Sequence, residues 1–428
     1  MKAENRSVFK KSLLGIMSAA AIFAGSAMPV FAETESNTTS TDNYSFKKQY
    51  TYSIPASEDT TSYKSPEEIF TFYSTQNDNN VENVATLQYV SDSSYNTSDS
   101  KLAAAPTDKN IPNTIGIGSA VYLEGGARLA LENNAFSDSD PNVSISLNDS
   151  SYPIPGVYYY WFKERDNGTA GVKYDQNKYW IAVQVAYDTT TAGTKVSSIH
   201  LLKDDNGEPD ISTTKDGTDT KYSYKQEGVI NTYAAGKLEV TKAVVGNLGD
   251  TTKEFAVKVT FGSNKPVKST INVVVANDPR STSQGGKISG SQLIKSDSSE
   301  SATTNDAASD ASSSQATNKF MYQNTFTYYV KDKTQITFQN IPVGVYVNVQ
   351  EDKYPEYQTT YQLDGKNAED SVGFFDIAGN NVYKLNITNT NDTTLPTGVF
   401  TSNLPYFIIL IAAAGGLVIF LVSRKHHV

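Results

Sequence analysis

Apolar and polar residues alternate along much of the chain. From Tyr44 to Ile54 every even position is apolar except Lys48, a period of two that is typical of a β-strand with one buried face. Helical periodicity is hard to find outside two apolar segments near the ends of the chain. Tyrosine occurs 27 times, and with the abundant Thr and Val it suits half-buried strands. The pattern predicts an all-β protein of the sandwich type.

Two units of this kind follow one another, here called the first unit (41–233) and the second unit (237–391), with the short joint Ala-Ala-Gly at 234–236. A weak internal repeat supports the division, because "IPGVYYYWFKE" in the first unit recurs as "IPVGVYVNVQE" in the second. The segment 295–318 is rich in Ser, Ala, Thr and Asp. It predicts a disordered insertion in the second unit, with a binding loop as the alternative.

Six polar residues interrupt the apolar faces of these predicted strands. Each unit contributes one lysine from an early strand, one glutamate from a middle strand and one asparagine from its last strand. They are Lys48, Glu164 and Asn231 in the first unit, and Lys242, Glu351 and Asn389 in the second.

Burial of such groups without partners is costly. One interpretation is a buried lysine–glutamate pair with a hydrogen-bonded asparagine, or strand ends that reach solvent. The other is reactive: burial lowers the pKa of the lysine and raises that of the glutamate. A neutral amine can then attack the asparagine carboxamide while the glutamate polarises its oxygen and relays protons. Loss of ammonia would leave an isopeptide bond from an early to the last strand.

Both ends of the chain carry targeting features. Residues 1–32 combine a basic start, an apolar stretch and a small-residue cleavage site, which predicts a signal peptide for export rather than an N-terminal anchor. Near the other end, Leu395-Pro396-Thr397-Gly398 precedes an apolar segment at 404–422 and two cations. This arrangement, spanning 394–428, predicts a cell-wall sorting signal with a transmembrane segment, and a plain C-terminal membrane anchor is the alternative.

Composition excludes several other classes of function. The net charge is −10 although both terminal segments are basic, so the exported part is strongly acidic and unsuited to nucleic acid. There is no cysteine, and His200 is the only histidine between the terminal segments, so we expect no metal site, no cofactor and no disulfide. No motif of a hydrolase, metalloprotease or nucleotide-binding enzyme is present, and the Asp/Asn-rich turns complete no calcium loop. We expect a structural protein, not an enzyme.

The motifs "GVYYYWFKE", "INTY" and "ITNT", with the Phe-x-Lys and Val-x-Lys opening strands, resemble backbone pilins of Gram-positive bacteria, the streptococcal T-antigen type in particular. The resemblance implies two tandem immunoglobulin-like (CnaB-type) domains with self-formed bonds. By position these bonds join Lys48 to Asn231, with Glu164 adjacent, and Lys242 to Asn389, with Glu351 adjacent. Lys47 is an open alternative to Lys48, although strand parity favours Lys48. The four-residue sorting motif, one residue shorter than usual, is shared with these pilins.

The resemblance also implies a function and its partners. A sortase would cleave after Thr397 and join it to a lysine of another copy, giving a covalent pilus on the cell wall of a Gram-positive bacterium. Lys225 is the first candidate for that lysine and Lys221 the second. Partners would be other copies of the chain, a pilus-specific sortase, accessory pilins and peptidoglycan, with transient retention in the membrane through the C-terminal helix. A singly anchored adhesin or a minor basal pilin is the alternative.

Overall fold

The computed structural model describes residues 44–56, 58, 60–76, 78–91, 102–105, 111–130, 136–147, 152–190, 193–211, 214–216, 219–221, 225–226, 228–295 and 320–392. The predicted signal peptide, nearly all of the predicted insertion and the predicted sorting signal lie outside these residues. Within them, no helix is both long enough and apolar enough to cross a lipid bilayer.

The described part of the first unit is built from strands, with one short 3₁₀ turn, η1 (Thr60–Ser62). In chain order the strands are β1 (Tyr44–Ser53), β2 (Glu68–Phe70), β3 (Phe72–Gln76), β4 (Asn79–Glu82), β5 (Val84–Ser91), β6 (Ala103–Ala104), β7 (Thr114–Ile117), β8 (Ala120–Tyr122), β9 (Arg128–Leu129), β10 (Asn142–Ser146), β11 (Gly156–Glu164), β12 (Val172–Lys173), β13 (Lys178–Asp188), β14 (Gly193–Asp205), β15 (Glu208–Pro209), β16 (Thr214–Asp216), β17 (Asp219–Lys221) and β18 (Lys225–Gln226).

The second unit is built in the same way, with one 3₁₀ turn, η4 (Gly290–Gln292). Its strands are β19 (Gly228–Val245), which begins in the first unit, then β20 (Phe255–Ser263), β21 (Thr270–Ala276), β22 (Gly286–Ser289), β23 (Ile294–Lys295), β24 (Tyr322–Val330), β25 (Gln335–Pro342), β26 (Val345–Glu351), β27 (Gln358–Leu363), β28 (Phe375–Asp376) and β29 (Val382–Thr390). The predicted all-β class is confirmed.

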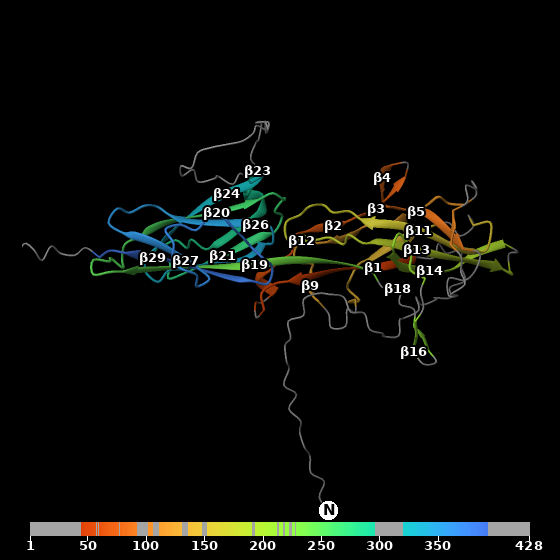
Figure 1. Cartoon of the computed structure of the whole chain (residues 1–428), viewed down its shortest axis with the longest axis horizontal. Coiled ribbons are helices and arrows are strands. Elements are labelled where there is room, and N and C mark those ends of the chain that lie inside the picture. The colour runs from red at the N-terminus through yellow and green to blue at the C-terminus, as the bar shows by residue number, and fades with distance from the viewer. Residues whose placement is uncertain are drawn as a thin grey trace, which may run out of the picture.

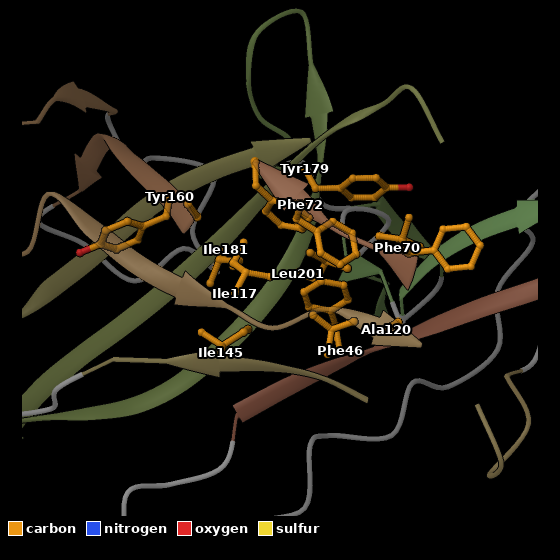
Figure 2. Packing of buried hydrophobic residues seen from close by; sticks show 14 of the residues in the cluster. Phe46, Phe70, Phe72, Ile117, Ala120, Ile145, Tyr160, Tyr179, Ile181 and Leu201 are labelled. Atoms are coloured by element: carbon orange, nitrogen blue, oxygen red, sulfur yellow. The ribbon is translucent and has the colours of Figure 1, made fainter. Parts of the chain in front are cut away.

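Each unit has its own hydrophobic core. In the first unit β1, β10, β7, β5, β11 and β13 pair in succession around a core rich in aromatic rings. Phe46 contacts Phe72 edge to face, with ring centroids 5.4 Å apart (Figure 2). Phe162 contacts Phe72 in the same way at 5.5 Å. In the second unit a sheet ordered β22-β21-β25-β19-β29-β27 packs on a sheet ordered β23-β24-β20-β26-β28, so this unit is a two-layer sandwich.

The strand β19 belongs to both units. Its first part pairs with β1 and its second part with β29, both in parallel, and Figure 1 shows it running from one group of strands to the other. The residues predicted to form a joint, 234–236, lie inside this strand. Three small residues in a row are typical of a linker. In the structure, however, Ala235 is buried and Gly236 lies close to the backbone of Ala378 and Asn381. The small residues therefore serve close packing where the units meet.

Candidate functional site: two buried lysine–glutamate–asparagine clusters

Parallel strand pairing brings each lysine next to its asparagine. Lys48 on β1 lies opposite Val229, two residues before Asn231 on β19. Lys242 on β19 lies opposite Ile387, again two residues before Asn389 on β29. Because side chains two residues apart on a strand point to the same face, both members of each pair point into the core, and the same offset recurs in the two units.

The glutamates come from the ends of two other strands. Glu164 is the last residue of β11, and Glu351 is the last residue of β26. Alternation along these strands keeps both carboxyl groups on the apolar side, where each is 4% exposed as a residue.

In the first unit the three side chains form one hydrogen-bonded cluster. Lys48 Nζ lies 3.1 Å from the Glu164 carboxylate, and Asn231 Nδ2 donates to Glu164 Oε1 at 2.6 Å. The amine also lies 4.7 Å from the centre of the Phe70 ring. Lys48 and Asn231 are both fully buried, so solvent does not reach the amine or the carboxamide.

The second unit repeats the arrangement. Lys242 Nζ lies 2.8 Å from Glu351 Oε2, and Asn389 Nδ2 donates to Glu351 Oε1 at 2.6 Å. The lysine and the glutamate form an ion pair at this distance, although their alignment is too poor for a hydrogen bond. The Phe255 ring covers the amine at 4.4 Å.

Burial sets the electrostatics of both clusters. Desolvation lowers the pKa of Lys48 despite the opposing attraction of Glu164, and it lowers the pKa of Lys242 to about 8. Desolvation also raises the pKa of Glu164, although Lys48 and Asn231 act in the opposite direction. In the first cluster both shifts favour a neutral amine beside a neutral carboxylic acid, and in the second cluster the lowered pKa of Lys242 favours the neutral, nucleophilic amine.

In both clusters the glutamate carboxyl group lies beside the nitrogen end of the asparagine carboxamide. Each glutamate bridges the lysine Nζ and the asparagine Nδ2, so it can carry a proton from the attacking amine to the leaving nitrogen. The sequence-based expectation that the glutamate polarises the amide oxygen is not what this geometry provides. Strand alternation indicates that the glutamate lies near the carboxamide, but it does not indicate which end of the carboxamide faces the carboxyl group.

The choice between Lys47 and Lys48 is decided by strand parity. Lys47 is only partly buried and its Nζ donates to the Asp140 carbonyl at 3.4 Å. Lys48 is the lysine beside Glu164 and Asn231. The structure therefore brings together both predicted sets of three residues.

A third cluster of the same three residue types lies where the units meet. Asn167 Nδ2 donates to Glu68 Oε1 at 2.8 Å, and Thr169 Oγ1 donates to Glu68 Oε2 at 2.9 Å. Lys268 Nζ of the second unit lies 3.3 Å from both carboxylate oxygens. The side chain of Lys268 is 45% exposed, against 0% for Lys48 and 1% for Lys242. Its ammonium stays hydrated, so this cluster suits an ion pair and not attack on an amide. Strand alternation could not reveal it, since Asn167 and Lys268 lie outside strands.

The remaining predicted residues are placed only in part. Lys225 begins β18, where it pairs with Leu202 on β14, and Lys221 ends the hairpin strand β17 opposite Thr214. The sorting motif, Leu395 to Gly398, lies outside the described residues.

The chain is similar to known pilins. A family model described as "Domain of unknown function (DUF7601)" matches residues 236–391. A protein named "Pilin" from Streptococcus pyogenes serotype M1 is 25% identical over 298 residues, which cover 66% of this chain and 72% of that protein. The resemblance to streptococcal pilins is confirmed by this match.

Solved pilin structures also align with the chain. The crystal structure of the major pilin from S. pyogenes aligns with 82% of this chain and 98% of its own, with 15% identity and a TM-score of 0.45. The major pilin T3.2 of the same species aligns over the same shares with 17% identity and a TM-score of 0.44.

Proposed function

We propose that this chain is the backbone subunit of a covalent pilus on the surface of a Gram-positive bacterium, stabilised by one internal Lys–Asn isopeptide bond in each unit. The observation that carries the proposal is the pair of buried clusters, each with an amine, a carboxyl group and a carboxamide in contact. The likeness to a streptococcal pilin supports the assignment to pili.

The bond-forming reaction uses only the groups of each cluster. The neutral lysine amine attacks the asparagine Cγ, and the glutamate carboxyl group exchanges protons with the reacting groups, giving one to Nδ2 and taking one from the amine. The Cγ–Nδ2 bond then breaks and ammonia leaves, so the carboxyl group ends with as many protons as it had at the start. One isopeptide bond forms and one amide bond breaks, so no oxidant or cofactor is consumed.

The bonds would replace the disulfides that the cysteine-free chain lacks. One would join β1 to the start of β19, and the other would join the end of β19 to β29. Because β19 takes part in both, the two bonds would form a covalent path through both units.

Assembly would use the predicted sorting motif. A sortase would form an acyl intermediate at Thr397 and pass it to a lysine of the next copy, for which Lys225 is the first candidate and Lys221 the second. Lys48 and Lys242 are unsuited to this step because they are buried. The role of the chain would then be structural and not enzymatic.

An immunoblot of boiled cell-wall extract tests the assembly. A backbone subunit gives a ladder of bands of increasing mass, because covalent polymers survive boiling. A single band at the mass of one chain would instead indicate a singly anchored adhesin or a minor pilin.

A further inference from the structure

The asparagine of the first cluster is hydrogen-bonded at both ends of its carboxamide. Its Nδ2 donates to Glu164 at 2.6 Å, and its Oδ1 accepts the backbone N–H of Asp175 at 3.0 Å. The same N–H lies 3.2 Å from Glu164 Oε2. In the second cluster Asn389 Nδ2 donates to Glu351 Oε1. Asn389 Oδ1, in contrast, is buried and has no hydrogen-bond partner among the described residues.

The segment that presents this N–H is held in place on both sides. Just before it, β12 pairs antiparallel with β19, so that Lys173 lies opposite Thr232, the neighbour of Asn231. After it, the Asp175 carboxylate accepts the Tyr179 hydroxyl at 2.6 Å and the Asn177 N–H at 2.8 Å. Tyr179 belongs to the core of the first unit. The N–H is thus aimed at Asn231 before any reaction begins.

We propose that the backbone N–H of Asp175 is the oxyanion donor for isopeptide formation in the first unit, an inference that rests on the proposed function. When Lys48 Nζ attacks Asn231 Cγ, the carbonyl π electrons move onto Oδ1, and the developing negative charge meets a donor already in position. As the Cγ–Nδ2 bond breaks and ammonia leaves, the charge returns and Oδ1 becomes the carbonyl oxygen of the new bond. A fixed donor in a water-free site stabilises such a charge without reorganisation during the reaction.

The same N–H also orients the carboxamide. A donor cannot face the amide Nδ2, so the contact with Asp175 fixes Oδ1 on that side and leaves Nδ2 toward Glu164. The leaving nitrogen is thereby kept beside the group that protonates it. The two clusters contain the same three residue types, but among the described residues a backbone N–H faces the asparagine Oδ1 only in the first cluster. The rates of the two bonds in one chain can therefore be compared directly.

Replacement of the Asp175 amide by an ester tests the proposal. Incorporation of the α-hydroxy acid analogue of aspartate at this position replaces N–H by oxygen and keeps the side chain with its contacts to Tyr179 and Asn177. We expect the crosslinked Lys48–Asn231 peptide to accumulate about 100- to 1,000-fold more slowly, the usual effect of losing one oxyanion donor. The Lys242–Asn389 peptide is expected to form at the wild-type rate. Both are followed by mass spectrometry of proteolytic digests after cell-free synthesis.

A matched control is the ester at Thr190, whose N–H donates to the carboxylate of Asp188, two residues earlier, at 2.9 Å on the exposed turn between β13 and β14, and makes no contact with the cluster. This control is expected to form both bonds at rates close to wild type, and circular dichroism verifies that both esters fold. Wild-type kinetics for the first bond in a folded Asp175 ester would overturn the inference, as would equal slowing of both bonds or equal slowing in the Thr190 ester. Absence of the first crosslink in the wild-type chain would overturn the proposed function instead.

Discussion

Among the lysines whose burial the structure describes, Lys48 and Lys242 stand apart because both are almost completely removed from water beside a carboxyl group. Lys268 also lies beside a glutamate, Glu68, but its side chain is nearly half exposed. Exposure therefore distinguishes the clusters proposed to react from an ion pair better than residue identity does. This difference can be predicted from sequence, because a lysine at an inward-pointing position of a predicted strand is expected to be buried.

Substitution of one glutamate is expected to affect one bond only. Glu164→Ala removes the proton relay of the first cluster, and Glu351→Ala removes that of the second. Each variant should retain the other bond, since each unit has its own core. Mass spectrometry of the two variants checks this directly, and each serves as the control for the other. Both bonds formed in either variant would contradict the proposed role of the carboxyl group.

Prevention of the second bond should introduce a pH dependence of stability. In Asn389→Ala, Lys242 remains a free buried amine, and its pKa of about 8 in the folded cluster is lower than in the unfolded chain. Between pH 8 and about 10.4 the unfolded state therefore binds more protons, and the stability of the folded state rises with pH. Below pH 8 the full penalty of burying this charge is present.

The measurement compares melting temperatures of Asn389→Ala and the wild type at pH 7.5 and pH 9.5. We expect the difference between the two proteins to shrink at the higher pH, because the proposed bond would convert Lys242 of the wild type into an amide that does not titrate. A constant difference would argue that Lys242 is not a free buried amine in the variant.

At the scale of elements, the parallel pairs β1–β19 and β19–β29 position the clusters. Gly228 is essential to the first pair, because a Cβ at this position would lie 1.8 Å from the Lys47 carbonyl oxygen. We expect Gly228→Ala to separate β1 from β19 and to slow or abolish the first bond while the second still forms. Gly286→Ala in β22 is the control, since its added methyl group meets no atom within 4 Å. Normal formation of the first bond in Gly228→Ala would show that the register is not required.

Strand alternation predicted much of this architecture. The all-β class and the three members of each cluster follow from period-two patterns around Lys48, Glu164 and their counterparts. The continuity of β19 was not predictable, because Ala-Ala-Gly reads as a joint until the neighbouring backbone that requires small residues is known. The contact of the Asp175 N–H with Asn231 was not predictable either, because every residue except proline has a backbone N–H and the sequence does not show where it points.

At the scale of the whole molecule, the bonds should increase stability against unfolding. Each would close a chain segment of more than a hundred residues, for which the loop-entropy relation derived for disulfides gives about 5 kcal/mol. We expect both glutamate variants to unfold at markedly lower denaturant concentration than the wild type. Equal midpoints for the bonded and unbonded proteins would contradict a stabilising role.

Polymerisation should require Thr397 in one copy and an accessible lysine in the next. Deletion of Leu395 to Gly398 is expected to abolish the ladder and release monomer. Lys225→Arg is expected to abolish it as well, because a guanidinium group stays protonated and does not accept an acyl group. Lys221→Arg is the matched control. Polymers that persist in Lys225→Arg with Thr397 linked to Lys221 would transfer the acceptor role to that residue.

The proposed bonds would lower the intact mass of the purified, folded chain. We expect a mass lower than that of the sequence by two molecules of ammonia, about 17 Da each, with digests that locate the losses at Lys48–Asn231 and Lys242–Asn389. The cluster of Lys268, Glu68 and Asn167 should contribute no third loss. An intact mass equal to that of the unmodified chain would contradict the account, and a third loss at Lys268 would contradict the argument that burial selects the reactive clusters.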